Sequence, residues 1–478
     1  MPTVDPKQAA QQLAPIEGFL IELGSRFQSA GFEISLVGGP VRDALLGRLS
    51  KAPDLDFTTS ARPDQILALL EGLAETTWDV GIRYGTVGAR IAGRECEITT
   101  YRSEHYDPSS RKPEVNFGDS LEGDLGRRDF TINAMALRLP EMLLVDLYGG
   151  ITDLAAGVIR TPNAPRMSFT DDPLRMMRAA RFASQLEFEV EAETLAAMVS
   201  MHERITIVSI ERVQVEFLKI IMSDHPRHGL KLIVDTGLAD YVVPELPRMR
   251  LEVDEHLQHK DVYEHSLTVL DQAIMMETMH EPVSGPDPVL RLAALFHDIG
   301  KPRTRKFEEG RVSFHHHEVV GARMTRKRMK EFRFSNELVD DVSRLVELHL
   351  RFHGYGTGEW TDSAVRRYVR DAGPLLVRLH KLTRADCTTR NRRRAAALQR
   401  SYEQLESRIA EITAQEELDS LRPDLDGQAI MRILDIPAGP QVGHAYRFLM
   451  ELRLDRGPMD PQAATDALVA WWADQPKV

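Results

Sequence analysis

The sequence contains little cysteine, no long apolar run and no excess of positive charge, and each absence narrows the possible function. Its 478 residues include two cysteines, Cys96 and Cys387, in unrelated contexts, which predicts neither a disulfide framework nor a thiolate metal site. No stretch approaches the roughly 20 apolar residues of a membrane span, and residues 1–15 lack a basic-then-apolar secretion signal. These absences predict a cytoplasmic protein with no membrane partner.

The formal net charge of −12 disfavours, on its own, a nucleic-acid partner. Basic residues are nevertheless concentrated in two stripes. Residues 323–333 hold six basic residues against the single acid Glu331, and residues 390–400 hold five arginines and no acid. Either stripe could follow a phosphate backbone, although a solvated helix face is the commoner reason for a run of charge.

The length predicts roughly two to four domains. Apolar residues at helical spacing predict a first helix over residues 7–30, and short β-type runs follow at 34–37, 55–58, 86–91 and 95–101. Beyond residue 150 the pattern is helical almost throughout. We therefore expect an α+β protein with a small mixed-sheet head and an all-helical body, divided as 1–150 (head with N-terminal helix), 151–250 (neck), 251–415 and 416–478 (helical tail).

The most informative segment is Leu36-Val-Gly-Gly-Pro-Val-Arg-Asp43, which includes Arg42. Gly38 and Gly39 end an apolar run, and Pro40 stands where a helix would begin. Free backbone N–H groups at such a helix start favour a polyanion such as a triphosphate. In Asp54-Leu-Asp56 the alternation of a strand places both carboxylates on one face, where they can share divalent cations.

Two later segments carry further candidate nucleotide-binding residues. Arg127-Arg-Asp-Phe-Thr-Ile-Asn-Ala134 is predicted to open an apolar helix through Leu137; Arg127 and Arg128 could hold phosphates, and Asp129 or Asn133 a ribose hydroxyl, although an Asp at such a place is more often a helix cap.

In Asp171-Asp-Pro-Leu-Arg-Met-Met-Arg178, Asp172 and Arg175 lie one helical turn apart. A carboxylate accepts from an exocyclic amino group and a guanidinium donates to a ring nitrogen or carbonyl, so this pair could read cytosine and adenine. The alternative is an ordinary i, i+3 salt bridge. Arg178 and Arg181 extend the basic face in steps of three.

In this order, the motifs resemble those of the nucleotidyltransferase superfamily, and specifically the bacterial tRNA nucleotidyltransferase and poly(A) polymerase family. The resemblance implies a polymerase-beta-like head in which Mg²⁺ is held by Asp54, Asp56 and a third carboxylate, Glu97, with Glu95 as the second choice. It also implies a flexible nucleotide-orienting loop at residues 103–118, ribose selection by the Arg127–Ala134 segment, and selection of CTP and then ATP by Asp172 and Arg175. Asp171 replaces the glutamate that is usual in the last motif.

A second constellation resembles the HD-domain phosphohydrolases. Phe296-His-Asp-Ile-Gly-Lys301 matches their signature, and the resemblance implies a metal site of His265, His297, Asp298 and Asp386, with His317 and His349 as further ligands. Such ligands suit a divalent transition metal or Mg²⁺. An HD domain can also serve only as an RNA-positioning scaffold.

The resemblance as a whole implies an enzyme that adds CCA to the 3′ end of tRNA, taking CMP and AMP from CTP and ATP and releasing pyrophosphate. A poly(A) polymerase, or an enzyme that adds only CC or only A, shares the head motifs and remains an alternative. An HD phosphohydrolase with a nucleotide-sensing head is the alternative from another class.

Overall fold

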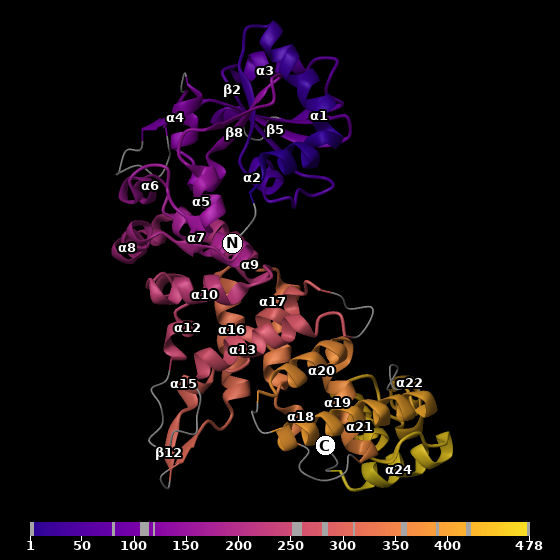
Figure 1. Ribbon diagram of the computed structural model, residues 1–478. Coiled ribbons are helices and arrows are strands. Elements are labelled where there is room, and N and C mark those ends of the chain that lie inside the picture. Colours follow the sequence, from indigo (N-terminus) through magenta and orange to yellow (C-terminus); the bar gives the residue numbers. More distant parts are fainter. Residues whose placement is uncertain are drawn as a thin grey trace. The chain divides into compact units, whose positions relative to one another are not determined.

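The computed structural model describes residues 4–78, 82–105, 114–117, 120–250, 261–279, 285–308, 311–354, 361–388, 392–416 and 422–475. Contacts within the chain divide it into two compact units, Met1–Pro247 (unit 1) and Arg248–Val478 (unit 2). In Figure 1, unit 1 runs from indigo to magenta and unit 2 ends in yellow. Among the described residues, no helix combines the length and apolar character that crossing a membrane requires.

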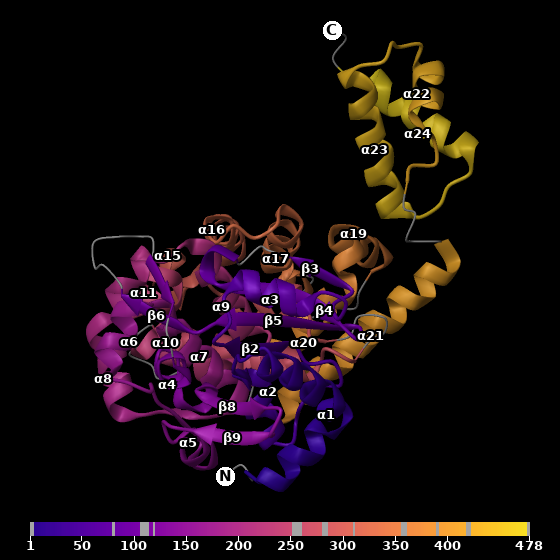
Figure 2. The ribbon, with the colours of Figure 1, turned by 90° about the horizontal axis from the view of Figure 1, so that it is seen from above.

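Unit 1 is built on a seven-stranded mixed sheet with the strand order β3-β4-β5-β2-β1-β8-β9. Strand β2 runs parallel to β5, and every other neighbouring pair is antiparallel. Figure 2 shows β5, β2, β8 and β9 following one another across this sheet. The strands are β1 (Ile34–Val37), β2 (Leu55–Thr59), β3 (Thr76–Trp78), β4 (Thr86–Ile91), β5 (Arg94–Thr100), β8 (Met135–Leu139) and β9 (Leu143–Asp146).

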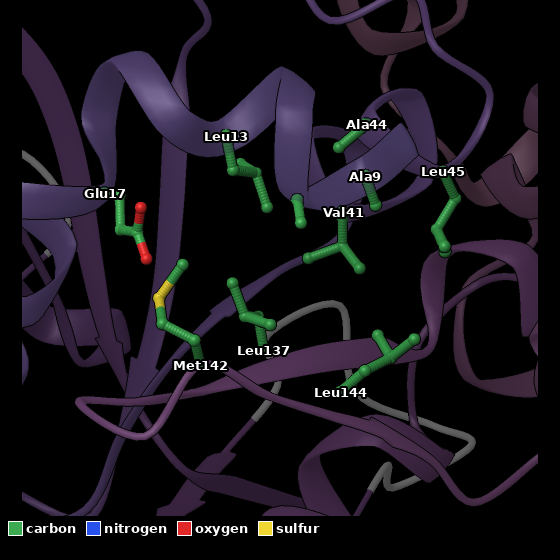
Figure 3. A pocket seen from close by; sticks show the side chains of 10 residues that line it. Ala9, Leu13, Glu17, Val41, Ala44, Leu45, Leu137, Met142 and Leu144 are labelled. Atoms are coloured by element: carbon green, nitrogen blue, oxygen red, sulfur yellow. The ribbon is translucent and has the colours of Figure 1, made fainter. Parts of the chain in front are cut away.

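Helices α1 (Pro6–Ser29), α2 (Gly39–Leu45) and α3 (Pro63–Leu70) pack against the sheet. The side chain of Asp5 caps α1 by accepting from the backbone N–H of Lys7, and Leu20 and Phe27 on its inner face are fully buried. Between α1, α2 and strands β8 and β9 lies a cavity of about 220 Å³. Its lining is apolar except for Glu17 (Figure 3), so it lacks the polar groups that a nucleotide needs.

The rest of unit 1 is helical. Helix α7 packs against both α9 and α10, and α6 packs against α8. These elements are α4 (Leu121–Gly126), α5 (Gly150–Ala156), α6 (Pro165–Asp171), α7 (Leu174–Leu186), α8 (Ala192–Met201), α9 (Ile210–Ile221), α10 (Pro226–Asp235), α11 (Ala239–Val242) and α12 (Glu245–Arg248), with the two-stranded sheet β10 (Val158–Ile159) and β11 (Glu189–Val190).

Two expectations for unit 1 were wrong. The apolar helix predicted through Leu137 is a single 3₁₀ turn, Thr131–Asn133, followed by β8, because pairing with the central strand β1 outweighs the helix propensity of its residues. The predicted loop at residues 103–118 instead includes the paired strands β6 (Arg102–His105) and β7 (Glu114–Phe117). The rest of that segment, residues 106–113 and 118, lies outside the described residues.

Unit 2 is almost entirely helical, as predicted. Helices α13, α14, α17 and α20 pack around a core that includes Leu267, Leu292, Val342 and Leu379. Its elements are α13 (Val262–Met275), α14 (Pro288–Phe296), α15 (Lys301–Thr304), the hairpin β12 (Lys306–Glu308) and β13 (Arg311–Ser313), α16 (His317–Glu331), α17 (Asn336–Leu348), α18 (Arg351–Gly354), α19 (Asp362–Ala372), α20 (Leu376–Ala385), α21 (Arg392–Glu416), α22 (Gly427–Leu434), α23 (Pro440–Arg456) and α24 (Pro461–Ala473). The predicted fold class, a mixed-sheet head followed by a helical body, is confirmed.

Candidate active site and metal cluster

The glycine turn brings the backbone close to two charged side chains. Gly38 ends β1 with a φ of 74° and caps α2, a conformation that favours glycine. A Cβ atom placed on it would lie 3.2 Å from Nη1 of Arg128 and 4.0 Å from Oδ2 of Asp56. The turn, an arginine and a carboxylate therefore share one small region. Arg42 also lies beside the turn, since a Cβ atom placed on Gly39 would lie 3.8 Å from its Nη2, and its Nη1 donates to Oδ1 of Asn133 at 2.7 Å.

The predicted carboxylates meet across neighbouring strands. Asp56 on β2 is the register partner of Glu97 on β5, while Asp54 immediately precedes β2. Glu95 lies two residues earlier on β5 and accepts from Arg90 at 3.2 Å. This register favours Glu97 over Glu95 as the third carboxylate.

The carboxyl of Asp56 is electrostatically crowded. Its side chain is exposed, yet partial desolvation raises its pKa to about 6. Arg128 lowers this pKa, and Glu97 and then Asp54 raise it. Carboxylates that disfavour one another's charge in this way suit a bound divalent cation, whose charge relieves their repulsion.

The segment from Arg127 to Asn133 is held by buried acids. Asp124, fully buried on α4, accepts from Nη2 of Arg127 at 3.0 Å and lies 3.5 Å from Nη2 of Arg128. Asp129 accepts from Nδ2 of Asn133 at 3.0 Å and from Nε of Arg178 at 2.8 Å. Both polar residues predicted to contact a ribose are thus bonded to each other.

The pair formed by Asp129 and Arg178 should make stability depend on pH. Burial alone would raise the pKa of Asp129, but Arg178 and the hydrogen bond from Asn133 outweigh it and hold that pKa well below its usual value. A lowered pKa stabilises the fold above the unfolded value of about 4, and this contribution is lost as pH falls below it.

Replacing Asp129 with asparagine is therefore expected to destabilise unit 1 by about 3 kcal/mol at pH 7, and by progressively less as the pH drops below about 4. Hydrogen exchange of amides in α7, measured from pH 7 to pH 3, checks this. A destabilisation that stays constant over that range would contradict it.

Asp172 and Arg175 lie beside a cavity of about 250 Å³ whose lining side chains are all charged. These side chains are those of Arg127, Arg128, Asp129, Asp172, Arg175, Arg178 and Arg212. Arg175 is nearly buried and donates from Nη1 to Oγ of Ser168 at 2.8 Å and from Nη2 to the carbonyl of Arg127 at 2.5 Å. The predicted base-reading pair and the predicted phosphate-binding arginines thus line one cavity.

Arg181 lies apart from this cavity lining. It is buried, lies 3.1 Å from Oε2 of Glu216 on α9, and places its guanidinium 4.4 Å from the ring centre of Phe182. Burial lowers its pKa to about 10, with the like charge of Arg178 adding to the shift and Glu216 opposing it. These contacts indicate that Arg181 has a structural role next to Arg178 and does not itself face the cavity.

In unit 2 the six predicted HD ligands lie together in two groups. His265, His297 and Asp386 form the first group, and Asp298, His317 and His349 form the second. Asp298 links the two groups. Its Oδ2 lies 3.2 Å from Nε2 of His297, and its Oδ1 lies 3.2 Å from Nε2 of His317. Nζ of Lys301 also lies 2.6 Å from Oδ2 of Asp298.

The histidine rings are oriented as in metal sites. Nδ1 of each of three rings lies 2.7–2.8 Å from the carbonyl three residues earlier, which assigns the proton to Nδ1 in His297, His317 and His349. Nε2 of His317 then presents a lone pair to a carboxylate oxygen at 3.2 Å, and among the described residues Nε2 of His349 has no hydrogen-bond partner. Acceptors that face one another inside a protein fit a bound cation.

The pKa values of two histidines in the cluster are shifted in opposite directions. Burial lowers the pKa of His349 to about 3, so this ring is neutral and able to bind metal at any physiological pH. Burial also opposes the charged form of His297, but Asp298 and Asp386 outweigh it and raise that pKa to about 10. A metal at this place would have to displace the proton of His297.

The basic stripe of residues 323–333 lies mostly on α16, where several of its members have acidic partners. Arg326 pairs with Asp340, and Arg328 lies 2.9 Å from Glu331. The second stripe begins at Arg390, outside the described residues, and continues along α21. A role of either stripe in RNA binding stays a prediction.

The sequence reasoning overlooked Asp124, Glu216 and Arg212. Asp124 carried a usable signal, because it stands three and four residues before Arg127 and Arg128, which is the spacing of helical neighbours. Arg212 carried none, since it stands 40 residues from its partner Asp172.

Three families match successive parts of the chain. Residues 34–160 match the poly A polymerase head domain, residues 187–249 the family described as "Probable RNA and SrmB- binding site of polymerase A", and residues 262–391 the HD domain. The first match lies in unit 1, the second lies in unit 1 except for its last two residues, and the third lies in unit 2.

Curated relatives include two CCA-adding enzymes. That of Lactobacillus helveticus (strain DPC 4571) is 41% identical over 243 residues, and that of Levilactobacillus brevis (strain ATCC 367) is 45% identical over 215 residues. These matches cover 50% and 45% of this chain and 59% and 52% of the relatives, so the chain matches little more than half of their length.

Solved structures resemble the whole chain. The Bacillus stearothermophilus CCA-adding enzyme in complex with CTP gives a TM-score of 0.69 at 23% identity, covering 97% of this chain and 98% of that one. The Thermotoga maritima CCA-adding enzyme complexed with tRNA gives 0.60 at 19% identity, covering 98% and 97%. At these identities the likeness establishes the fold.

Proposed function

Because residues 34–160 match the poly A polymerase head domain and residues 262–391 match the HD domain, we propose that this chain adds CCA to the 3′ end of tRNA. It would transfer CMP and then AMP from CTP and ATP and release pyrophosphate. These substrates place the proposed activity in the cytoplasm. Its similarity to the two CCA-adding enzymes described above supports the proposal.

One observation carries the proposal. Asp56 and Glu97 stand opposite each other on β2 and β5, beside a glycine turn and Arg128, and Arg128 also lines the charged cavity that holds Asp172 and Arg175. Arg128 thus lies beside the carboxylate pair and also lines the charged cavity, which is large enough for a base. This is the combination that metal-dependent chemistry on a selected nucleotide requires.

Asp54, Asp56 and Glu97 would hold Mg²⁺, because clustered carboxylates are its preferred protein ligands. Bound there, the metal would lower the pKa of the tRNA 3′-hydroxyl and neutralise charge on the triphosphate. Arg128 lies within reach of the same region and would contact the phosphates. The 3′-hydroxyl oxygen bonds to the α-phosphorus as the bond to the bridging oxygen breaks, and pyrophosphate leaves.

Base choice would fall to the charged cavity. The ionised carboxylate of Asp172 can only accept hydrogen bonds, so it favours the amino groups of cytosine and adenine over the carbonyls of uracil and guanine. Arg175 is held by Ser168 and the carbonyl of Arg127, so its position is set by the fold. The protein would act as the template.

The test is to incubate the protein with tRNA that lacks its CCA end and with each labelled nucleotide in turn. We expect ordered addition of C, C and A that then stops. A lengthening A tail from ATP alone would indicate a poly(A) polymerase. Addition that ends after CC, or that requires CC already in place, would indicate a partial enzyme.

A second function, phosphoester hydrolysis in unit 2, is supported by the six-ligand cluster. The ligand types and the facing acceptors fit two divalent ions, such as Mn²⁺, linked by Asp298. The same cluster would also be compatible with a scaffold that binds metal without turnover.

We expect a protein loaded with Mn²⁺ to bind one ion at each of the two groups and to hydrolyse 2′,3′-cyclic AMP. Asp298→Ala should lose both ions and lower hydrolysis by at least about 100-fold, whereas His349→Ala should lose only one ion. The exposed His315 offers a matched control, since His315→Ala removes an imidazole near the cluster without touching it. Elemental analysis that finds both ions retained in Asp298→Ala would refute the assignment.

A further inference from the structure

The carboxylate of Asp172 accepts hydrogen bonds from two different helices. Its Oδ1 accepts from the backbone N–H of Leu174 at 3.1 Å, at the start of α7. Its Oδ2 accepts from Nη2 of Arg212, on α9, at 2.8 Å. The first bond is a local cap, whereas the second ties the carboxylate to a different helix.

The two arginines beside Asp172 differ in exposure and in their hydrogen-bond partners. Arg175 is 8% exposed and donates from Nη1 to Ser168 and from Nη2 to the carbonyl of Arg127. The side chain of Arg212 is 54% exposed and lines the same cavity. Arg212 donates directly to the carboxylate that would read the base.

We propose that Arg212 is a positioning residue for base selection, which fixes the orientation of Asp172. The inference rests on the proposed function. A carboxylate held at Oδ2 by a guanidinium keeps its remaining lone pairs directed at one place. Without that bond, Asp172 keeps only its cap at Oδ1, can turn about its side-chain bonds, and distinguishes an amino group from a carbonyl less well.

The test compares single and double variants in the nucleotide-addition assay. Arg212→Ala should raise the KM for CTP and ATP by about 10-fold with little change in kcat, and should raise UMP and GMP misincorporation by a similar factor. Arg212→Lys, which keeps the charge but not the planar fork, should recover part of the selectivity. Adding Arg212→Ala to Asp172→Ala should change selectivity no further, because the residue acts through Asp172.

Arg166 supplies the matched control, because it is an exposed arginine on α6 whose side chain donates to Ser200 and lies outside the cavity lining. Arg166→Ala should keep the wild-type selectivity. Unchanged selectivity in Arg212→Ala, or an equal effect of Arg212→Ala with and without Asp172, would overturn the inference. If Arg212→Ala unfolds, Arg212→Gln takes its place in the same comparison. Absence of any C or A addition by the wild-type protein would instead refute the proposed function.

Discussion

Replacing Asp56 with alanine should lower nucleotide transfer by on the order of 10³-fold while tRNA binding is retained. Asp56 stands at the centre of the carboxylate group, opposite Glu97 and one residue beyond Leu55 from Asp54. Its loss removes a proposed ligand of Mg²⁺ without opening a cavity, because the side chain is exposed. Single-turnover addition of CMP and a separate tRNA-binding measurement check the two halves of this expectation.

The same experiment distinguishes the two glutamates on β5. Glu97→Ala should resemble Asp56→Ala, whereas Glu95→Ala should keep most activity because Glu95 pairs with Arg90. Asp64→Ala, which removes an exposed acid from α3 outside the carboxylate group, is the matched control. Transfer above about a tenth of the wild-type rate in Asp56→Ala would rule out its role as a metal ligand.

Replacing Asp172 with alanine should remove most of the preference for CTP over UTP and for ATP over GTP. A hydrogen-bonding pair that reads a base edge contributes roughly 1–3 kcal/mol of discrimination, which corresponds to about 5- to 150-fold. The loss should appear mainly as a higher KM for the correct nucleotides and a nearly unchanged KM for the wrong ones, because uracil and guanine present a carbonyl where cytosine and adenine present the amino group that this carboxylate accepts from.

Competition between paired nucleotides, one labelled, measures the ratio of kcat/KM directly. Asp172→Asn is the informative companion, since an amide both donates and accepts and should therefore admit the carbonyls of uracil and guanine. Full discrimination in Asp172→Ala would show that base choice lies elsewhere in unit 1. Asparagine keeps an oxygen that can accept from the backbone N–H of Leu174, whereas alanine does not. A loss of discrimination in Asp172→Asn at unchanged thermal stability therefore separates recognition from folding.

From the sequence, the residues of the candidate site could be predicted better than the contacts between those residues. Strand alternation placed Asp54 and Asp56 on one face, and the β-rich run around Glu97 was expected to supply a third carboxylate. The structure adds that Asp56 and Glu97 are direct neighbours across a parallel strand pair. That register depends on which strands pair, which no local pattern specifies.

The wrong predictions have the same cause, because strand pairing and helix packing between distant segments cannot be predicted from a local pattern. Met135–Leu139 is rich in good helix formers, yet it lies between β1 and β9 in the sheet. Arg212 could not be found because its partner Asp172 belongs to another helix–loop segment, and only the packing of α7 against α9 brings them together. Contacts between distant segments are decided by tertiary packing rather than by local propensity.

The candidate metal site of unit 2 gains part of its electrostatic field from the backbone rather than from its side chains. Helices α14, α17 and α20 end at His297, His349 and Asp386 respectively. Each helix carries roughly half a negative charge at its carboxyl end, so three backbone dipoles add an attractive field for cations at the place where the ligands gather. We therefore expect affinity for a positive ion to be partly a property of the helical scaffold, so that replacing a single ligand weakens the site without reversing its preference for cations.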